Sequence, residues 1–182
     1  MLTLFFGKQV YCPRNFAGRD TAGEPGTDMS NQIDIKELVG DALQASRFAV
    51  LSTESDGQPH ASLVAITPAE GHRHLIFATY RDTRKYRNLV DNSKVAVFID
   101  GRELAASDPR EGFVLTALGL AEEVGNAGHD AALRAHLERH PDLDSFLRSA
   151  DCALFRVTVG AYQIVRGIDD VRWWSIDDPA AT

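Results

Sequence analysis

Hydrophobic and polar residues alternate along most of the chain from about residue 47 onward, in runs rich in Val, Ile, Thr and aromatic residues. A period of two predicts half-buried β-strands. The first two runs are separated by ESDGQP, whose Asp-Gly pair is typical of a tight hairpin turn. Glycines in the fifth run allow that strand to bend. The predicted strands cover residues 47–53, 60–67, 72–80, 94–100, 112–124, 152–167 and 171–177.

Apolar residues spaced three and four positions apart predict helices between these strands. One helix is expected behind the candidate cap Asp34, and another follows the third strand with Asp82 or Thr83 as its cap. Residues 129–150 are expected to form two helices broken at Pro141. Adjacent strands joined by short connections, with few helices, predict a mainly β fold: a β-barrel with helical additions.

The composition of the chain changes near residue 32. Residues 12–31 are rich in Gly, Pro, Asp and Thr and show no apolar period, which predicts a flexible N-terminal extension over residues 1–31. The folded domain is therefore expected over residues 32–182. No run approaches the ~20 apolar residues of a membrane-spanning helix, so we expect no membrane partner.

The charge balance narrows the function classes. Lys and Arg total 19 against 26 Asp and Glu, a formal net charge of −7, which argues against a protein that binds nucleic acid or an anionic membrane over a broad surface. Cys12 and Cys152 lie far apart and match no disulfide or metal-ligand spacing. Their sparse use is typical of a reducing compartment, so a cytoplasmic location and no metal site are expected.

One short stretch runs against the acidic balance. FATYRDTRKYRNL, residues 77–89, joins the third predicted strand to a helix and places four basic residues within seven positions. Two of them fall in the first helical turn, where the helix dipole is already positive, so their presence favours an anion among them. The four residues are Arg81, Arg84, Lys85 and Arg87.

Two other interpretations of this stretch stay open on the residues alone. A solvated surface turn, partly balanced by Asp82 and Asp91, explains the charges equally well. Tyr80 and Tyr86 interleave with the cations as a nucleic-acid stacking surface would require, but the acidic total disfavours that reading.

Three segments in order resemble the core of the FMN-binding split-barrel superfamily, which includes pyridoxamine 5′-phosphate oxidase. They are QPHASLVAIT, LIFATYRDTRKYRNLVDNSKVAVFID and LTALGLAEEV, and the resemblance spans roughly residues 46 to 125. It implies a six-stranded antiparallel split barrel that forms a homodimer, with FMN in a groove at the subunit interface.

The resemblance also implies roles for particular residues. The strand written Ser62-Leu63-Val64-Ala65-Ile66-Thr67 would run beside the flavin ring, with its backbone bonded to the ring edge. Ala78 and Thr79 would line the ribityl and phosphate end. Arg84 and Lys85 would clamp the phosphate, and Thr83 would add a hydroxyl. The implied cofactor-binding residues are Ser62, Leu63, Val64, Ala65, Thr67, Ala78, Thr79, Thr83, Arg84 and Lys85.

The sequence departs from pyridoxamine phosphate oxidases at its C-terminal end. Those enzymes carry an Arg-x-His pair and an Arg-Leu-Ala-Pro type ending, whereas this chain reads VRWWSIDDPAAT. We therefore expect an FMN-dependent oxidoreductase of unknown substrate, with NAD(P)H or a small oxidisable molecule as partner, and assign no catalytic residue. The alternatives are a non-catalytic flavin or haem binding module and an F420-dependent reductase.

Histidine and tryptophan residues near the C-terminal end complete the candidates. His136 and His140 lie four apart in HLERH, which is not a metalloprotease motif, and a solvated helix face is the expected reading. Trp173 and Trp174 face opposite sides of the last strand, so one is expected in the core and the other over the flavin or the dimer interface.

Overall fold

The computed structural model describes residues 35–102, 112–166 and 170–176. A single curled sheet dominates this part of the chain, and every hydrogen-bonded pair of strands in it is antiparallel. The resemblance implied six strands and the periodicity predicted seven. The described residues form eight, because the predicted strand over residues 60–67 breaks in two at Ile66. The mainly β barrel with helical additions is confirmed.

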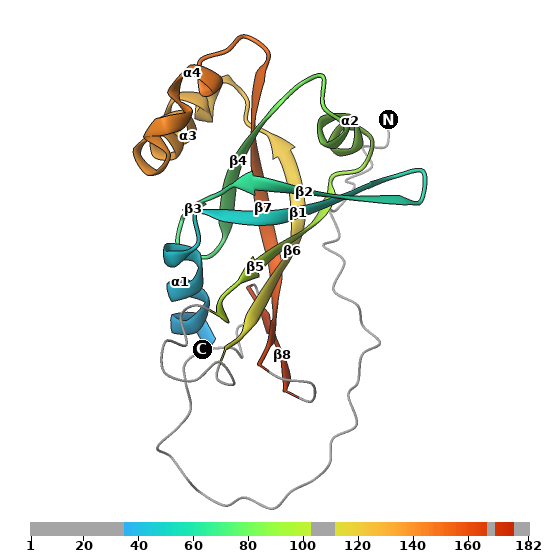
Figure 1. Ribbon diagram of the computed structural model, residues 1–182, viewed down its shortest axis with the longest axis vertical. Helices are drawn as coiled ribbons and strands as arrows, with labels where there is room; N and C mark the ends of the chain where they lie inside the picture. The colour runs from blue at the N-terminus through green and yellow to red at the C-terminus, as the bar shows by residue number, and fades with distance from the viewer. Residues whose placement is uncertain (1–34, 103–111, 167–169, 177–182) are drawn as a thin grey trace, which may run out of the picture.

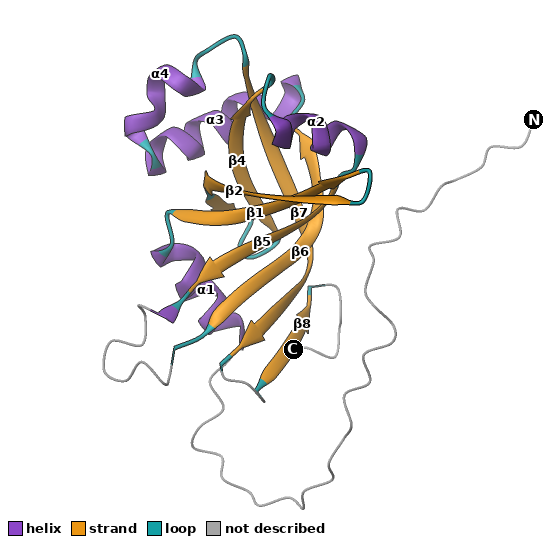
Figure 2. Ribbon diagram, turned by 45° about the vertical axis from the view of Figure 1, so that its right-hand side comes forward, coloured by secondary structure: helices purple, strands orange, loops and turns teal. Residues whose placement is uncertain are grey.

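The strands are β1 (Phe48–Ser55), β2 (Gln58–Ala65), β3 (Thr67–Ala69), β4 (His74–Tyr80), β5 (Lys94–Asp100), β6 (Val114–Glu123), β7 (Cys152–Val165) and β8 (Val171–Ser175). The helices are α1 (Ile35–Ala45), α2 (Arg84–Asp91), α3 (Asn126–Arg139) and α4 (Asp144–Leu147), with the 3-10 turn η3 (Pro141–Leu143) before α4. Helices α2, α3 and α4 gather at one end of the sheet, away from β8 (Figures 1 and 2).

The order of strands in the sheet explains how the barrel closes. The order is β2-β1-β5-β6-β7-β4-β3, with β8 paired to β7. Strands β2 and β3 are consecutive in the chain, yet they lie at opposite ends of this order. The sheet therefore curls around, so that one continuous segment, residues 58–69, contributes a strand to each of its two edges. Among the described strands, β2 pairs only with β1, so its other edge stays open beside β4 and splits the barrel.

The core fills the inside of the curled sheet. Strands β1, β5 and β7 alternate buried and more exposed residues, as the period of two predicted. Helix α1 contributes Val39, Ala42 and Leu43 to the same core. A smaller cluster, formed by Ile76, Ala132, Leu147 and Leu154, lies where α3 and α4 cover β4 and β7.

Local sequence signals agree with the observed turns. Asp56 and Gly57 both have positive φ, 53° and 75°, and they connect β1 to β2 as the Asp-Gly pair predicted. In β6 the register against β7 shifts at Leu118/Gly119, the predicted bend. A Cβ on Gly119 would lie 2.3 Å from the Thr158 carbonyl oxygen, so only glycine allows the two backbones to approach this closely.

Some of the remaining predictions are confirmed, and others concern residues outside the described ranges. The helical break at Pro141 is confirmed, since α3 ends at Arg139 and η3 begins at Pro141. Trp174 is buried and stacks on Tyr162, whereas Trp173 is exposed. The predicted extension, the cap Asp34 and Cys12 lie outside the described residues, and the domain boundary stays a prediction. In the described helices we find none long and apolar enough to cross a membrane.

Candidate functional site

A cavity of about 270 Å³ opens where the barrel splits. Its walls come from the open strand β2, the end of β4, the start of α2 and the inner side of α3 and α4. An edge strand carries unpaired backbone N–H and C=O groups, so a ligand at β2 finds hydrogen-bonding partners in the main chain. The lining residues are Phe48, Leu63, Val64, Ala65, Ala78, Thr79, Tyr80, Thr83, Lys85, His136, Leu143 and Phe146.

The start of α2 supplies the polar end of the cavity. Thr83 is the N-cap and its hydroxyl accepts from the Tyr86 backbone N–H at 3.3 Å, as the sequence predicted. The same hydroxyl donates to the Tyr80 carbonyl at 2.8 Å and lies 2.9 Å from that of Thr79. Lys85 follows in the first helical turn, half-buried, and burial lowers the pKa of its ammonium. A cation and helix N–H groups therefore converge on one anion-sized region.

The structure separates the four basic residues of the FATYRDTRKYRNL stretch. Arg81 forms an ion pair with Glu123 and donates to the Tyr86 hydroxyl at 2.7 Å. Arg87 donates to the Asp82 carbonyl at 3.2 Å. Within the described part of the chain, Arg84 and Lys85 have neither an ion-pair nor a hydrogen-bond partner for their side chains. The two cations predicted to clamp a phosphate are thus the two of the four whose side chains have no polar partner among the described residues.

The histidine pair corrects the prediction from sequence. His136 and His140 are not on a solvated face: both are fully buried, with ring centroids 4.8 Å apart. The Nδ1 atom of His136 lies 2.8 Å from the Thr67 hydroxyl oxygen, and the ring lines the cavity. The spacing of four puts Ala132, His136 and His140 on one side of α3 and its cap, but the spacing alone does not distinguish a buried side from a solvated one.

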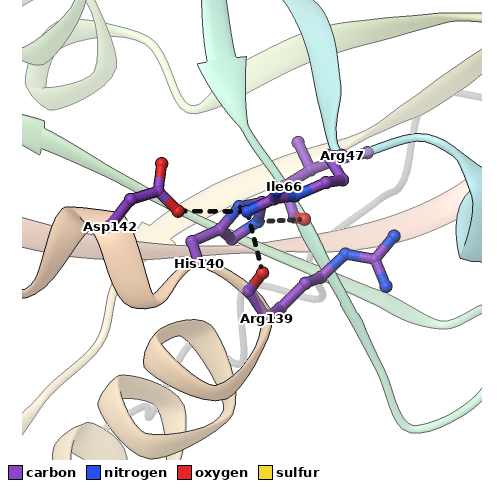
Figure 3. A network of polar contacts seen from close by, with 5 residues as sticks. All are labelled: Arg47, Ile66, Arg139, His140 and Asp142. Carbon is purple, nitrogen blue, oxygen red and sulfur yellow. Dashed lines mark hydrogen bonds and ion pairs between the residues drawn. The ribbon is translucent and has the colours of Figure 1, made fainter.

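His140 belongs to a network that fixes the end of α3 (Figure 3). Its Nε2 lies 2.9 Å from the Ile66 carbonyl oxygen, which only accepts, so Nε2 carries the proton. The guanidinium of Arg47 lies 3.5 Å from Nδ1 and also donates to the Arg139 carbonyl and to Asp142, each at 3.1 Å. The break between β2 and β3 is thereby tied to α3.

Burial and charge keep His136 neutral. Burial, then the neighbouring His140 and Arg139, lower the pKa of His136 to about 4. Its second ring nitrogen, Nε2, is buried and has no hydrogen-bond partner among the described residues. A buried, unpaired imidazole nitrogen at a cavity wall is a group that a ligand satisfies.

The cavity brings most of the predicted cofactor-binding residues together. Of those ten, it is lined by Leu63, Val64, Ala65, Ala78, Thr79, Thr83 and Lys85. The other three lie around it: Thr67 is held against His136, Arg84 is exposed, and the buried Ser62 hydroxyl has no partner among the described residues. Their binding roles stay predictions. The sequence reasoning missed the aromatic side chains of Phe48 and Phe146, which only the fold brings to this wall.

These residues fit a phosphate-bearing group with a flat apolar portion. The cation, hydroxyls and helix start suit a phosphate, and apolar and aromatic side chains line the rest of the cavity. Its volume, about 270 Å³, falls below the ~300–1,000 Å³ of complete small-molecule sites.

Comparison with known proteins gives a fold and a family. A haem-binding protein from Mycobacterium smegmatis matches with a TM-score of 0.68 at 21% identity, over 77% of this chain and 57% of that one. The haem storage protein HutZ from Vibrio cholerae matches with a TM-score of 0.56 at 21% identity, over 70% of this chain and 89% of that one.

 

An FAD-binding protein from Mesorhizobium loti matches with a TM-score of 0.57 at 19% identity, over 68% of this chain and 88% of that one. The chain spans 57% of the length of the M. smegmatis protein, which is less than two thirds. At these identities the solved structures show the fold alone.

A search of curated proteins returned no match. The sequence model of the family described as pyridoxamine 5′-phosphate oxidase matches residues 35–165, which is most of the chain. The chain therefore belongs to the pyridoxamine 5′-phosphate oxidase family.

Proposed function

We propose that this protein binds FMN in the cavity at the split of the barrel and acts as an FMN-dependent oxidoreductase. The observation that carries the proposal is a pair of cations, Arg84 and Lys85, in the first turn of α2, whose side chains have no polar partner among the described residues. Lys85 lines the cavity and is half-buried, so its charge needs an anion there. The FAD-binding relative supports a flavin, and the phosphate of FMN supplies that anion.

A homodimer completes the site in this proposal. The cavity is smaller than a complete small-molecule site, and large apolar side chains at its rim are exposed. Leu63 is 69% exposed and Phe48 is 50% exposed, which a second copy of the chain would cover. FMN bound between the two copies would supply hydride or electron transfer, with NAD(P)H or a small oxidisable molecule as the partner.

Titration with FMN tests the binding part of this proposal. Wild-type protein should quench flavin fluorescence on binding, and Lys85→Ala should weaken the affinity about tenfold or more, because charge-assisted phosphate contacts contribute about 1.5–3 kcal/mol. Arg87→Ala is the matched control, since Arg87 lies on the same helix but bonds to the Asp82 carbonyl. A colourless protein that takes up no FMN would refute the proposal, and an equal loss in both variants would refute the role of Lys85.

Haem binding is the second candidate. It is favoured by the buried His136, whose Nε2 has no partner among the described residues, and by the haem-binding relatives. Imidazole is a common axial ligand of haem iron. Titration with ferric haem distinguishes this candidate, because coordination by a histidine changes the Soret absorption band.

A further inference from the structure

His136 is a buried polar group that the phosphate site leaves unexplained. It is fully buried, it lines the cavity, and its Nε2 has no hydrogen-bond partner among the described residues. Buried polar atoms are nearly always paired, and an orphan of this kind at a cavity wall points to a group that binds there. Since Thr67 occupies Nδ1, Nε2 is the ring atom left for a ligand.

The contact with Thr67 holds the imidazole ring of His136 in place. The Thr67 hydroxyl is buried and lies 2.8 Å from Nδ1, its one side-chain hydrogen bond among the described residues. A neutral imidazole has one donor nitrogen and one acceptor nitrogen. The Thr67 hydroxyl is able to donate to Nδ1 or to accept from it, so Nε2 offers a ligand either an N–H or a lone pair.

We propose that His136 is a cofactor-binding residue of the flavin site, in which Nε2 forms a hydrogen bond with a polar atom of FMN. Thr67 is its positioning residue, because its hydrogen bond to Nδ1 fixes the orientation of the ring. This inference rests on the proposed function. Haem iron would use the lone pair of the same Nε2 atom, so flavin binding and haem binding through His136 are alternatives that titration separates.

Two substitutions of His136 separate its two nitrogens. The amide of His136→Asn reaches the position of Nδ1 but not that of Nε2, whereas the amide of His136→Gln reaches the position of Nε2. Fluorescence titration should show FMN binding weakened about five- to tenfold in His136→Asn, the loss of one hydrogen bond. His136→Gln should restore most of that affinity. His129→Asn is the control, because His129 lies on α3 and does not line the cavity.

Thr67 provides an independent arm that does not depend on the folding of the His136 variants. Thr67→Val removes the hydroxyl with little change of shape and should weaken FMN binding about threefold or more, whereas Thr67→Ser should bind as wild type does. Equal affinity in wild type, His136→Asn and Thr67→Val would overturn the inference and leave the proposed function standing. Failure of wild type itself to bind FMN would instead overturn the proposed function.

The haem arm of the experiment completes the test. Wild-type protein titrated with ferric haem should show no histidine-dependent Soret shift. A shift that is present in wild type and His129→Asn but lost in His136→Asn would make Nε2 an iron ligand and would overturn the inference.

Discussion

The free energy of unfolding should fall as the pH is lowered from neutral, because His136 is buried as a neutral imidazole. Burial, His140 and Arg139 lower the pKa of His136 from 6.5 to about 4. In the unfolded chain the same imidazole takes up its proton at its ordinary pKa. Between these two values the unfolded state binds more protons than the folded state, so acid favours unfolding. The contribution of His136 is fully present above about pH 6.5 and is lost progressively down to about pH 4.

The size of this effect follows from the difference between the two pKa values. One pKa unit corresponds to about 1.4 kcal/mol, so a shift from 6.5 to about 4 gives on the order of 3 kcal/mol. About 2 kcal/mol of this should already be lost at about pH 5, where most carboxylates are still ionised. Total stabilities of about 5–15 kcal/mol are typical of domains, so the loss is measurable.

Urea unfolding measures this loss through tryptophan fluorescence, since the buried Trp174 stacks on Tyr162. Wild-type protein at about pH 7 and at about pH 5 should differ by about 2 kcal/mol. His136→Asn removes the titrating group and should reduce the difference by about that amount. His129→Asn, which changes a partly exposed histidine, should keep it. The reasoning is refuted if wild type and His136→Asn lose the same stability on acidification.

Two further predictions concern residues that hold the site in place. Arg139→Ala should lower the free energy of unfolding by about 2–4 kcal/mol, because the guanidinium donates to three carbonyls at and just beyond the end of α1. Urea unfolding measures the loss, and Arg134→Ala, a change at an exposed residue on the same helix, is the control. An equal effect of the two substitutions would contradict the role given to Arg139. Gly119→Ala should cost about 3 kcal/mol, because its Cβ would lie 2.3 Å from the Thr158 carbonyl oxygen. Gly128→Ala, where the nearest atom is 3.4 Å away, should leave the thermal midpoint unchanged or raised, and a Gly119→Ala midpoint equal to wild type would show that the bulge tolerates a side chain.

Elements set by local chemistry could be predicted from sequence. The Asp-Gly turn between β1 and β2 requires positive φ at both residues, and the cap of α2 requires a hydroxyl, so each signal lies within a few positions of the structure that it specifies. The wall formed by Leu63, Val64 and Ala65 followed from the resemblance to a known family rather than from periodicity alone. The split in the strand at Ile66 was not visible, because the apolar run continues through it.

The burial of the histidine pair could not be predicted from the spacing in HLERH. Histidine is intermediate in its tendency to be buried, so its location depends on the partners that the fold supplies. Those partners are Thr67 and the Ile66 carbonyl, which lie 69 and 74 positions away in the chain. Only tertiary structure brings them to α3. The same spacing on a helix without such partners would be a solvated face.

The break at Ile66 joins barrel closure to ligand binding. Where the chain leaves β2 and enters β3, the backbone N–H of Ile66 donates to the Arg47 carbonyl at 3.0 Å and its own carbonyl lies 2.9 Å from Nε2 of His140. The next residue, Thr67, contacts His136, and the residue before, Ala65, lines the cavity. His140 at the end of α3 therefore bonds to the backbone at the split. One turn earlier, His136 has a ring nitrogen without a hydrogen-bond partner among the described residues. Because the same helix positions both histidines, a displacement of α3 that loosened the barrel would also move the nitrogen proposed to bind the flavin.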